Sequence, residues 1–145
     1  MTNYSKVIEI YTRNCGSERT FKRQFYKNLI YTEGIMDFQQ SLNAFWLVDN
    51  VITYMTHVIK TFKATEDTFY VVKIRLNKEK QGYMEVYREG FVDNEYKKHI
   101  TVVKQKIPYI DLPVKIDKAM TTYKFYLTLV NYEPLQFMLM LPSEY

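Results

Sequence analysis

Four carboxylates that stand in blocks of apolar and aromatic residues are the first candidates for chemistry: Glu33, Asp49, Asp111 and Glu144. Such groups can act as general acids and bases, or hold Mg²⁺. Each also has a structural interpretation, which we favour. Glu33 fits the first turn of a helix, where the helix dipole favours an anion. Asp111 stands between two prolines and suits a turn, and Glu144 is expected to pair with a Lys or Arg.

Asp49 lies in a run of apolar residues at helical spacing. A carboxylate in such surroundings must be paired, hydrogen-bonded or at the rim of the core. A hydrogen bond to a backbone amide or to Tyr31 would satisfy it. A hydrolase that uses Asp49, Asp111 or Glu144 is therefore only the third of the functions that we consider.

Histidine and cysteine do not form a pattern typical of a metal site or a nucleophile. His57 and His99 have no Asp or Glu three or four residues further on, so they lack metal-ligand spacing. Cys15 could be a nucleophile at a helix N-terminus, where a thiolate is favoured, but a loop residue is the favoured interpretation. Walker A, GxGxxG, GxSxG and HExxH motifs are absent from the sequence. We expect no catalytic residue, no metal and no cofactor.

Cations and tyrosines recur along the strands predicted below. Eight of them could share one exposed face of a sheet: Lys73, Arg75, Tyr83, Tyr87, Lys104, Lys106, Lys124 and Tyr126. Aromatic side chains interleaved with cations are what proteins use to bind single-stranded nucleic acid. However, Glu85 lies in the same region, there is no RNP-like motif, and an ordinary exposed sheet face shows the same alternation. Both interpretations stay open.

The elements that would position these residues begin with helices. Apolar residues at helical spacing predict a short helix over residues 3–12, although Val-Ile-Glu-Ile-Tyr would also suit a strand. Gly16 can end this element, and Ser17 can cap the next. An amphipathic helix is then predicted by three apolar residues at four-residue intervals with cations between them: Phe21, Phe25 and Leu29.

The stretch from Leu29 to Met55 organises the helical part and holds the only tryptophan, Trp46. Thr32 is the expected N-cap of one helix. Asn43 could cap a further helix, whose apolar residues cover most of its surface, as in a buried helix. We expect this helix to lie over the sheet that follows.

From Asp67 onward the apolar period changes from about 3.6 to 2, which is typical of strands. Five strands are predicted: 68–76, 83–88, 99–107, 121–130 and 135–141. A polar turn over 77–82, a charged connection over 88–98 and a turn at Glu133-Pro134 separate them. An edge strand, 99–107 or 135–141, could form a homodimer.

Helices first and strands later predict an α+β fold, with N-terminal helices packed on one face of a four- to five-stranded, mainly antiparallel sheet. The chain of 145 residues is expected to be a single domain, residues 1–145, with a helical part, 1–62, and a sheet part, 67–145.

Composition sets further limits. The net charge of +4 is mildly basic and mixed along the chain, so contact with nucleic acid or an acidic partner is permitted. The single Cys15 excludes an intramolecular disulfide and suits a reducing compartment. The N-terminus does not resemble a signal peptide, and no apolar run approaches the ~20 residues of a membrane span. We expect a cytoplasmic protein that has no contact with a membrane.

Four sequence blocks resemble a family of unknown function, made up of small proteins of bacteria, phages and mobile elements. They read Tyr31-Thr32-Glu33-Gly34, Phe45-Trp46-Leu47-Val48-Asp49, Ile107-Pro108-Tyr109-Ile110-Asp111-Leu112-Pro113 and Leu141-Pro142-Ser143-Glu144-Tyr145. Residues 67–106 carry no such block. The resemblance implies no activity. It implies a genetic context, accessory genes of phages and mobile elements, which often encode proteins that bind and block host machinery.

The first expected function is therefore that of a non-enzymatic accessory protein that binds a host protein and inhibits a host defence system. Binding of RNA or single-stranded DNA by the Tyr/Lys sheet face is the alternative. Tyr145 is expected to pack against the domain near Trp46, or to form a docking surface with its ring and carboxylate. The candidate interaction or structural-motif residues are Tyr31, Glu33, Trp46, Asp49, Asp111, Glu144 and Tyr145.

Overall fold

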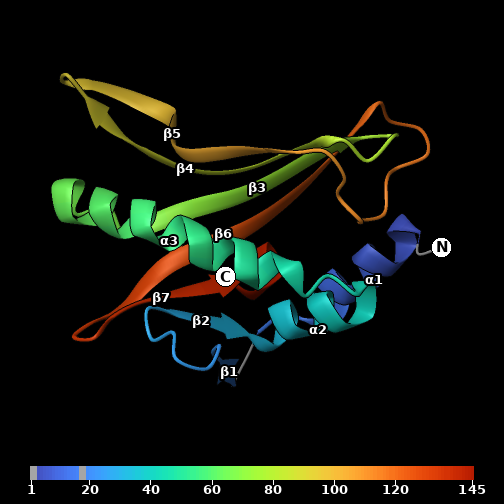
Figure 1. Cartoon of the computed structure of the whole chain (residues 1–145), viewed down its shortest axis with the longest axis horizontal. Helices are drawn as coiled ribbons and strands as arrows, with labels where there is room; N and C mark the ends of the chain where they lie inside the picture. Colours follow the sequence, from blue (N-terminus) through green and yellow to red (C-terminus); the bar gives the residue numbers. More distant parts are fainter. Residues whose placement is uncertain (1–2, 17–18) are drawn as a thin grey trace.

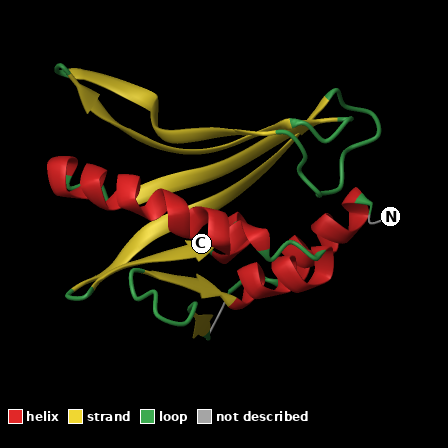
Figure 2. Ribbon diagram, in the orientation of Figure 1, coloured by secondary structure: helices red, strands yellow, loops and turns green. Residues whose placement is uncertain are grey.

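The structure is a computed structural model that describes residues 3–16 and 19–145. Its α-helices are α1 (Tyr4–Arg13), α2 (Glu33–Leu42) and α3 (Trp46–Thr65) (Figure 1, Figure 2). The strands are β1 (Thr20–Phe21), β2 (Leu29–Thr32), β3 (Phe69–Asn77), β4 (Gly82–Val92), β5 (Glu95–Ile107), β6 (Met120–Tyr132) and β7 (Leu135–Met140). A short 3₁₀ turn, η1 (Pro142–Glu144), follows the last strand.

The seven strands form one mixed sheet in the order β1-β2-β7-β6-β3-β4-β5. The pair β2–β7 is parallel, and the other neighbours are antiparallel. The α+β class is confirmed, and each of the five predicted strands is present. The expected number of four to five strands is wrong, because the sheet gains β1 and β2 from a segment that was predicted to be helical.

The segment from Thr20 to Thr32 differs most from the prediction. The predicted helix through Phe21, Phe25 and Leu29 is instead β1, a loop and β2. Phe25 is exposed and has a φ of 68°, which a right-handed helix excludes. Leu29 pairs with Phe137 of β7, so a strand near the other end of the chain supplies the backbone partners. The predicted cap, Ser17, lies outside the described residues.

The helices pack on one face of the sheet, as predicted. Their ring contacts with inward-facing strand residues are Tyr4 of α1 with Tyr123, Phe38 of α2 with Phe125, and Phe62 of α3 with Phe137. The long helix α3 crosses this face of the sheet, and α2 lies near the N-terminal end of α3 (Figure 1). We refer to this side of the sheet as the covered face.

Helix α3 buries one side against the core and leaves the other side exposed. Its buried residues are Leu47, Val48, Val51, Tyr54, Met55 and Val58. The Asp49 side chain is 63% exposed, so of the expected alternatives it lies at the rim of the core, where it is paired with Arg23. Trp46 is half-buried at the start of the helix. Asn43 does not cap α3; its φ of 52° makes it the left-handed C-cap of α2.

The charged connection predicted over 88–98 is also wrong, because β4 and β5 continue into it as a long hairpin. Asp93 and Asn94 form the turn and both have positive φ, 51° and 65°. This pair of left-handed residues is the signature of a two-residue type I′ turn, and Asp and Asn tolerate it better than most residues. In Figure 1 the hairpin tip stands apart from β3 and β6.

The sheet has its two edges at β1 and β5. The strand predicted over 99–107 is thus an edge strand, but β7 lies between β2 and β6 and is not available as an edge. Among the helices described, none is long and apolar enough to cross a membrane.

Candidate functional site

Each candidate carboxylate has partners of its own, although Glu33 and Glu144 both lie at the start of α2. Glu33 Oε1 accepts from Arg19 Nε at 2.6 Å, on the outside of α2. Asp111 Oδ1 lies 3.5 Å from Lys80 Nζ. Within residues 3–16 and 19–145, no cluster of three or more His, Cys, Asp or Glu side chains could hold a metal ion. The geometry therefore does not support a shared carboxylate site.

Asp49 forms an ion pair with Arg23, at 3.0 Å between Nε and Oδ1. Arg23 also donates to the Tyr31 hydroxyl at 3.0 Å and to the Phe45 carbonyl at 3.2 Å. The expected link between Asp49 and Tyr31 therefore exists only through the guanidinium group. This network ties the β1–β2 loop to the start of α3, which is a structural role.

Glu144 anchors the C-terminal turn to the start of α2. Its carboxylate accepts hydrogen bonds from Thr32 Oγ1 at 2.6 Å, from the Gly34 amide at 3.1 Å and from the Leu141 amide at 2.9 Å. The partners that the described residues supply to this carboxylate are a hydroxyl and two amides. The site is a helix N-terminus, which attracts an anion for the reasons expected for Glu33. Thr32 also caps the helix as predicted, accepting from the Ile35 amide at 3.3 Å.

The eight cations and tyrosines predicted to share a face do so. On β3 and β6, Lys73 pairs with Lys124, and Val71 with Tyr126. The pairs that join these residues across β3, β4 and β5 are Val71 with Tyr87, Lys73 with Glu85, Arg75 with Tyr83, Tyr83 with Lys106, and Glu85 with Lys104. Directly paired residues point to the same side of a sheet, so all eight lie opposite the helices. We call this surface the open face.

Glu85 lies at the middle of the open face and is only 3% exposed. It accepts hydrogen bonds from Thr101 and from His99 Nε2, the latter at 2.8 Å, and it lies 3.5 Å from Lys73 Nζ. Burial acts to raise the pKa of the Glu85 carboxyl, but Thr101, His99 and Lys73 together hold this pKa below its ordinary value. Glu85 therefore stays an anion and fixes Lys73, whose side chain is 16% exposed.

Cations lie against aromatic rings across this face. Lys104 Nζ is 4.1 Å from the centroid of the Tyr83 ring, and Lys73 Nζ is 5.6 Å from the centroids of both Tyr83 and Tyr87. His99 stacks on Tyr87 with centroids 4.0 Å apart and an interplanar angle of 19°. From its sequence pattern His99 was a candidate only for a metal ligand. Alternation alone would place His99 and Thr101 on the face opposite Lys104. A register shift between Val103 and Thr101 brings them to the same face, so the sequence pattern carried no signal for it.

A second aromatic group lies on the neighbouring strands. The Phe69 ring is 5.0 Å from Tyr126, and Tyr145 packs edge-on against both, at 5.4 and 5.3 Å. Tyr145 thus packs against the domain as expected, but on the open face rather than near Trp46. Its side of the sheet is decided by η1, which carries the chain round the end of β7. Phe69 was missed as a site residue, although it alternates in phase with Lys73.

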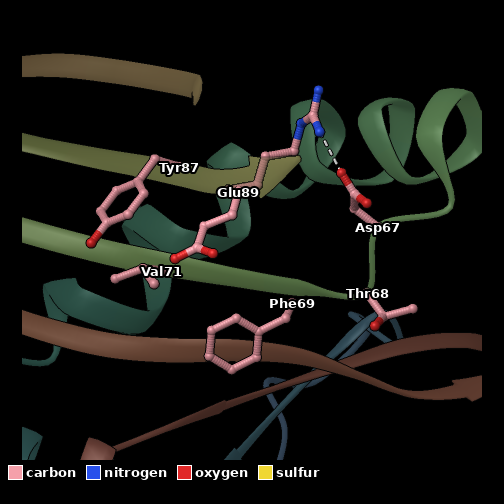
Figure 3. A pocket seen from close by; sticks show the side chains of 7 residues that line it. Asp67, Thr68, Phe69, Val71, Tyr87 and Glu89 are labelled. Carbon is pink, nitrogen blue, oxygen red and sulfur yellow. Dashed lines mark hydrogen bonds and ion pairs between the residues drawn. The ribbon is translucent and has the colours of Figure 1, made fainter. Parts of the chain in front are cut away.

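Two hollows open on this face. One, of about 350 Å³, is lined by Asp67, Thr68, Phe69, Val71, Tyr87, Arg88 and Glu89 (Figure 3). The other, of about 560 Å³, is lined by Asn77, Gln81, Gly82, Tyr83, Lys104 and Lys106. The open face therefore offers cations, exposed rings and recesses beside them.

Comparison with known proteins gives one match. A family model described as "Family of unknown function (DUF6876)" matches residues 7–145. No curated protein and no solved structure matches the chain. The resemblance drawn from the four sequence blocks is confirmed at this coarse level. Its phage and mobile-element context stays a proposal.

Proposed function

The chain belongs to the family of unknown function DUF6876, and we propose that it is a non-enzymatic protein that binds single-stranded RNA or DNA on the open face of its sheet. One observation carries the proposal. The cations and tyrosines selected from the sequence all lie on the side of the sheet that the described α-helices leave uncovered. A sheet that stacks bases on aromatic residues of its central strands is a recurrent mode of RNA recognition.

The charges of the open face favour a polyanion. Apart from the ion pair of Arg88 with Asp67, it carries five Lys or Arg side chains against the carboxylates of Glu85 and Glu89. Lys73 and Lys124 are direct neighbours on adjacent strands, an arrangement that destabilises a sheet. A phosphate between these two lysines would relieve the repulsion. Glu85 offsets it only in part, because its contact is with Lys73.

The rings favour unpaired bases over a duplex. Phe69, Tyr126 and Tyr145 form one group, and Tyr87 with His99 forms another. Base stacking on an aromatic side chain contributes about 1–3 kcal/mol per base, whatever the base. A duplex keeps its bases stacked on one another and would not use these rings.

The test is binding of short single-stranded RNA and DNA, measured by fluorescence anisotropy over a range of salt concentrations. We expect log K to fall with log salt, with a slope of about −0.7 for each phosphate contacted. Tyr126→Ala should weaken binding about tenfold, within the range expected for one stacked base.

A matched pair of double variants separates the open face from net charge. Lys104→Glu with Lys124→Glu changes two cations of the open face. Lys60→Glu with Lys63→Glu makes the same change of charge on exposed positions of α3. The first pair should abolish binding and the second should leave most of it. Equal losses, or the absence of binding at low salt, would refute the proposal.

Binding of a host protein is the second candidate, and a different surface favours it. A mostly apolar groove of about 290 Å³ is lined by Trp46, Asn50, Ile107, Tyr109, Ile110 and Asp111. The Tyr109 side chain is exposed there, and Trp and Tyr are enriched at protein interfaces. Inhibition of a host defence system by a mobile-element protein would use such a surface.

Affinity purification from host cells after nuclease treatment tests this second function. A stoichiometric partner that is lost with Tyr109→Ala, but kept by the Lys104/Lys124 double variant, would place protein binding at the groove. A partner that disappears with nuclease treatment would instead support nucleic acid on the open face.

A further inference from the structure

We infer that the hollow between Tyr87 and Phe69 is a pocket for one base of the bound strand and that Glu89 makes it selective for guanine. This inference rests on the proposed function and adds a substrate class to it. The hollow lies on the open face, beyond Val71 and Tyr87, the last pair between β3 and β4 on the way to the hairpin tip. Figure 3 shows the Glu89 carboxylate between the rings of Tyr87 and Phe69.

The walls of the pocket suit a flat ring. Phe69 and Tyr87 contribute aromatic rings and Val71 an apolar floor. The volume of about 350 Å³ falls near the lower end of the range for ligand pockets, as a single base requires. Arg88 and Asp67 form an ion pair at one side and hold the start of β3 against β4. The pocket is therefore already formed without ligand.

Glu89 supplies the hydrogen-bonding group. The Tyr96 hydroxyl donates to Glu89 Oε2 and so fixes the orientation of the carboxylate. An ionised carboxylate has two oxygens that only accept hydrogen bonds. Asp67, which also lines the hollow, is paired with Arg88, and Glu85 is buried among its own partners, whereas Glu89 is exposed.

Guanine is the base that matches this acceptor pair. Its Watson–Crick edge places two donors side by side, N1–H and the 2-amino group. Adenine and cytosine offer one amino donor next to a ring nitrogen that is itself an acceptor, and uracil places a single donor between two carbonyl oxygens. Those acceptors would face the Glu89 oxygens and be repelled. Two correctly paired hydrogen bonds discriminate between bases by about tenfold or more.

The charge of the surroundings argues for a base rather than for a basic side chain of a protein. Glu89 is an anion on a face dominated by lysines, which would repel an arginine-rich peptide. The same lysines attract phosphates, so a strand held by its backbone would place a base in reach of the carboxylate. Glu89 therefore costs some general affinity and provides selectivity in exchange.

The first experiment varies the ligand and leaves the protein intact. Single-stranded oligonucleotides that differ only in one central base are compared by anisotropy. We expect guanine to bind about tenfold more tightly than the other bases, and inosine, which lacks the 2-amino group, to lose most of this advantage. 7-Deazaguanine keeps both Watson–Crick donors and should bind like guanine.

The second experiment varies the protein. Glu89→Gln is nearly isosteric but replaces one acceptor by a donor, so it should remove the guanine preference. Because an anion is lost, binding of the other oligonucleotides should stay the same or tighten. Glu95→Gln, on an exposed position of the same hairpin, makes the same change of charge and should keep the preference.

The outcomes distinguish this inference from the proposed function. Equal binding of all the oligonucleotides would refute the guanine pocket and leave the nucleic-acid face intact. Binding of none would refute both. Free GMP that binds as tightly as the oligonucleotide would overturn the assignment to a strand, and an arginine-rich peptide that displaces the oligonucleotide from the wild type but not from Glu89→Gln would assign the pocket to a protein partner.

Discussion

The Glu144 carboxylate lies so close to Gly34 that no larger residue fits at this position without displacing it. The carboxylate lies against the start of α2, bound to Thr32 Oγ1 and to the Gly34 amide. A Cβ added at Gly34 would overlap the Glu144 carboxylate. The glycine is therefore required by a close approach between two segments from opposite ends of the chain, and not by its backbone angles, because its φ is not positive.

Gly34→Ala should destabilise the protein by about 1–3 kcal/mol, because overpacking forces a side chain out of place. Chemical denaturation measures the loss. In the background of Glu144→Ala the same substitution should cost much less, since the obstructing group is gone and alanine favours a helix. Costs that simply add in the double variant would contradict the predicted contact.

At the scale of elements, an ion pair joins α1 to α2, which are already in contact. Arg13 at the end of α1 donates through Nε and Nη2 to both oxygens of Asp37 in α2, each at 2.6 Å. Ser41 and Asn14 also donate to this carboxylate. The hydrogen bond from Arg13, with those from Ser41 and Asn14, lowers the pKa of Asp37 to about 2 despite partial burial. Asp37 thus sets the position of α1 on α2.

Asp37→Asn should reduce the free energy of unfolding at neutral pH by about 1–2 kcal/mol, a value discounted because the Arg13 side chain is half exposed. The pKa is lower in the folded than in the unfolded state, so this stabilisation is present above the ordinary value of 3.8 and is lost as the pH falls toward about 2. Denaturation midpoints of the variant and wild type should converge over that range. A constant difference down to pH ~2 would contradict the ion pair.

At the scale of the whole molecule, the helices cover one face of the sheet, and β5 is an edge strand beside the open face. The cations Lys97, Lys98, Lys104 and Lys106 lie along that edge strand. Lysines on an edge are a common protection against pairing with a second sheet. Lys104 and Lys106 therefore serve the proposed nucleic-acid face, and all four lysines oppose the homodimer that an exposed strand would otherwise permit.

We expect the protein to sediment as a monomer at low salt, because antiparallel pairing of two β5 strands would bring lysines such as Lys98 and Lys104 of different copies close together. Sedimentation velocity without nucleic acid measures this. Salt should weaken the repulsion, so that any dimer forms only at high ionic strength. A dimer at low salt that dissociates when salt is added would overturn the prediction.

The candidate face was predictable from the sequence for a local reason. Alternation along a strand places every second residue on the same side, so Lys73, Arg75 and Tyr83 could be assigned to one surface before the strand order was known. The same reasoning covers the change of period near Asp67 and the cap at Thr32, because both depend on residues a few positions apart.

What the sequence determined by itself was therefore the periodicity of each element and the phase of its side chains. The tertiary structure decided which strands are neighbours, and so that Leu29 pairs in β2, that Glu144 meets Gly34 and that Tyr145 joins Phe69. These contacts join residues far apart in the chain. The free energy of these contacts comes from burial and hydrogen bonds that exist only once the sheet has formed. A local sequence pattern therefore cannot predict the contacts.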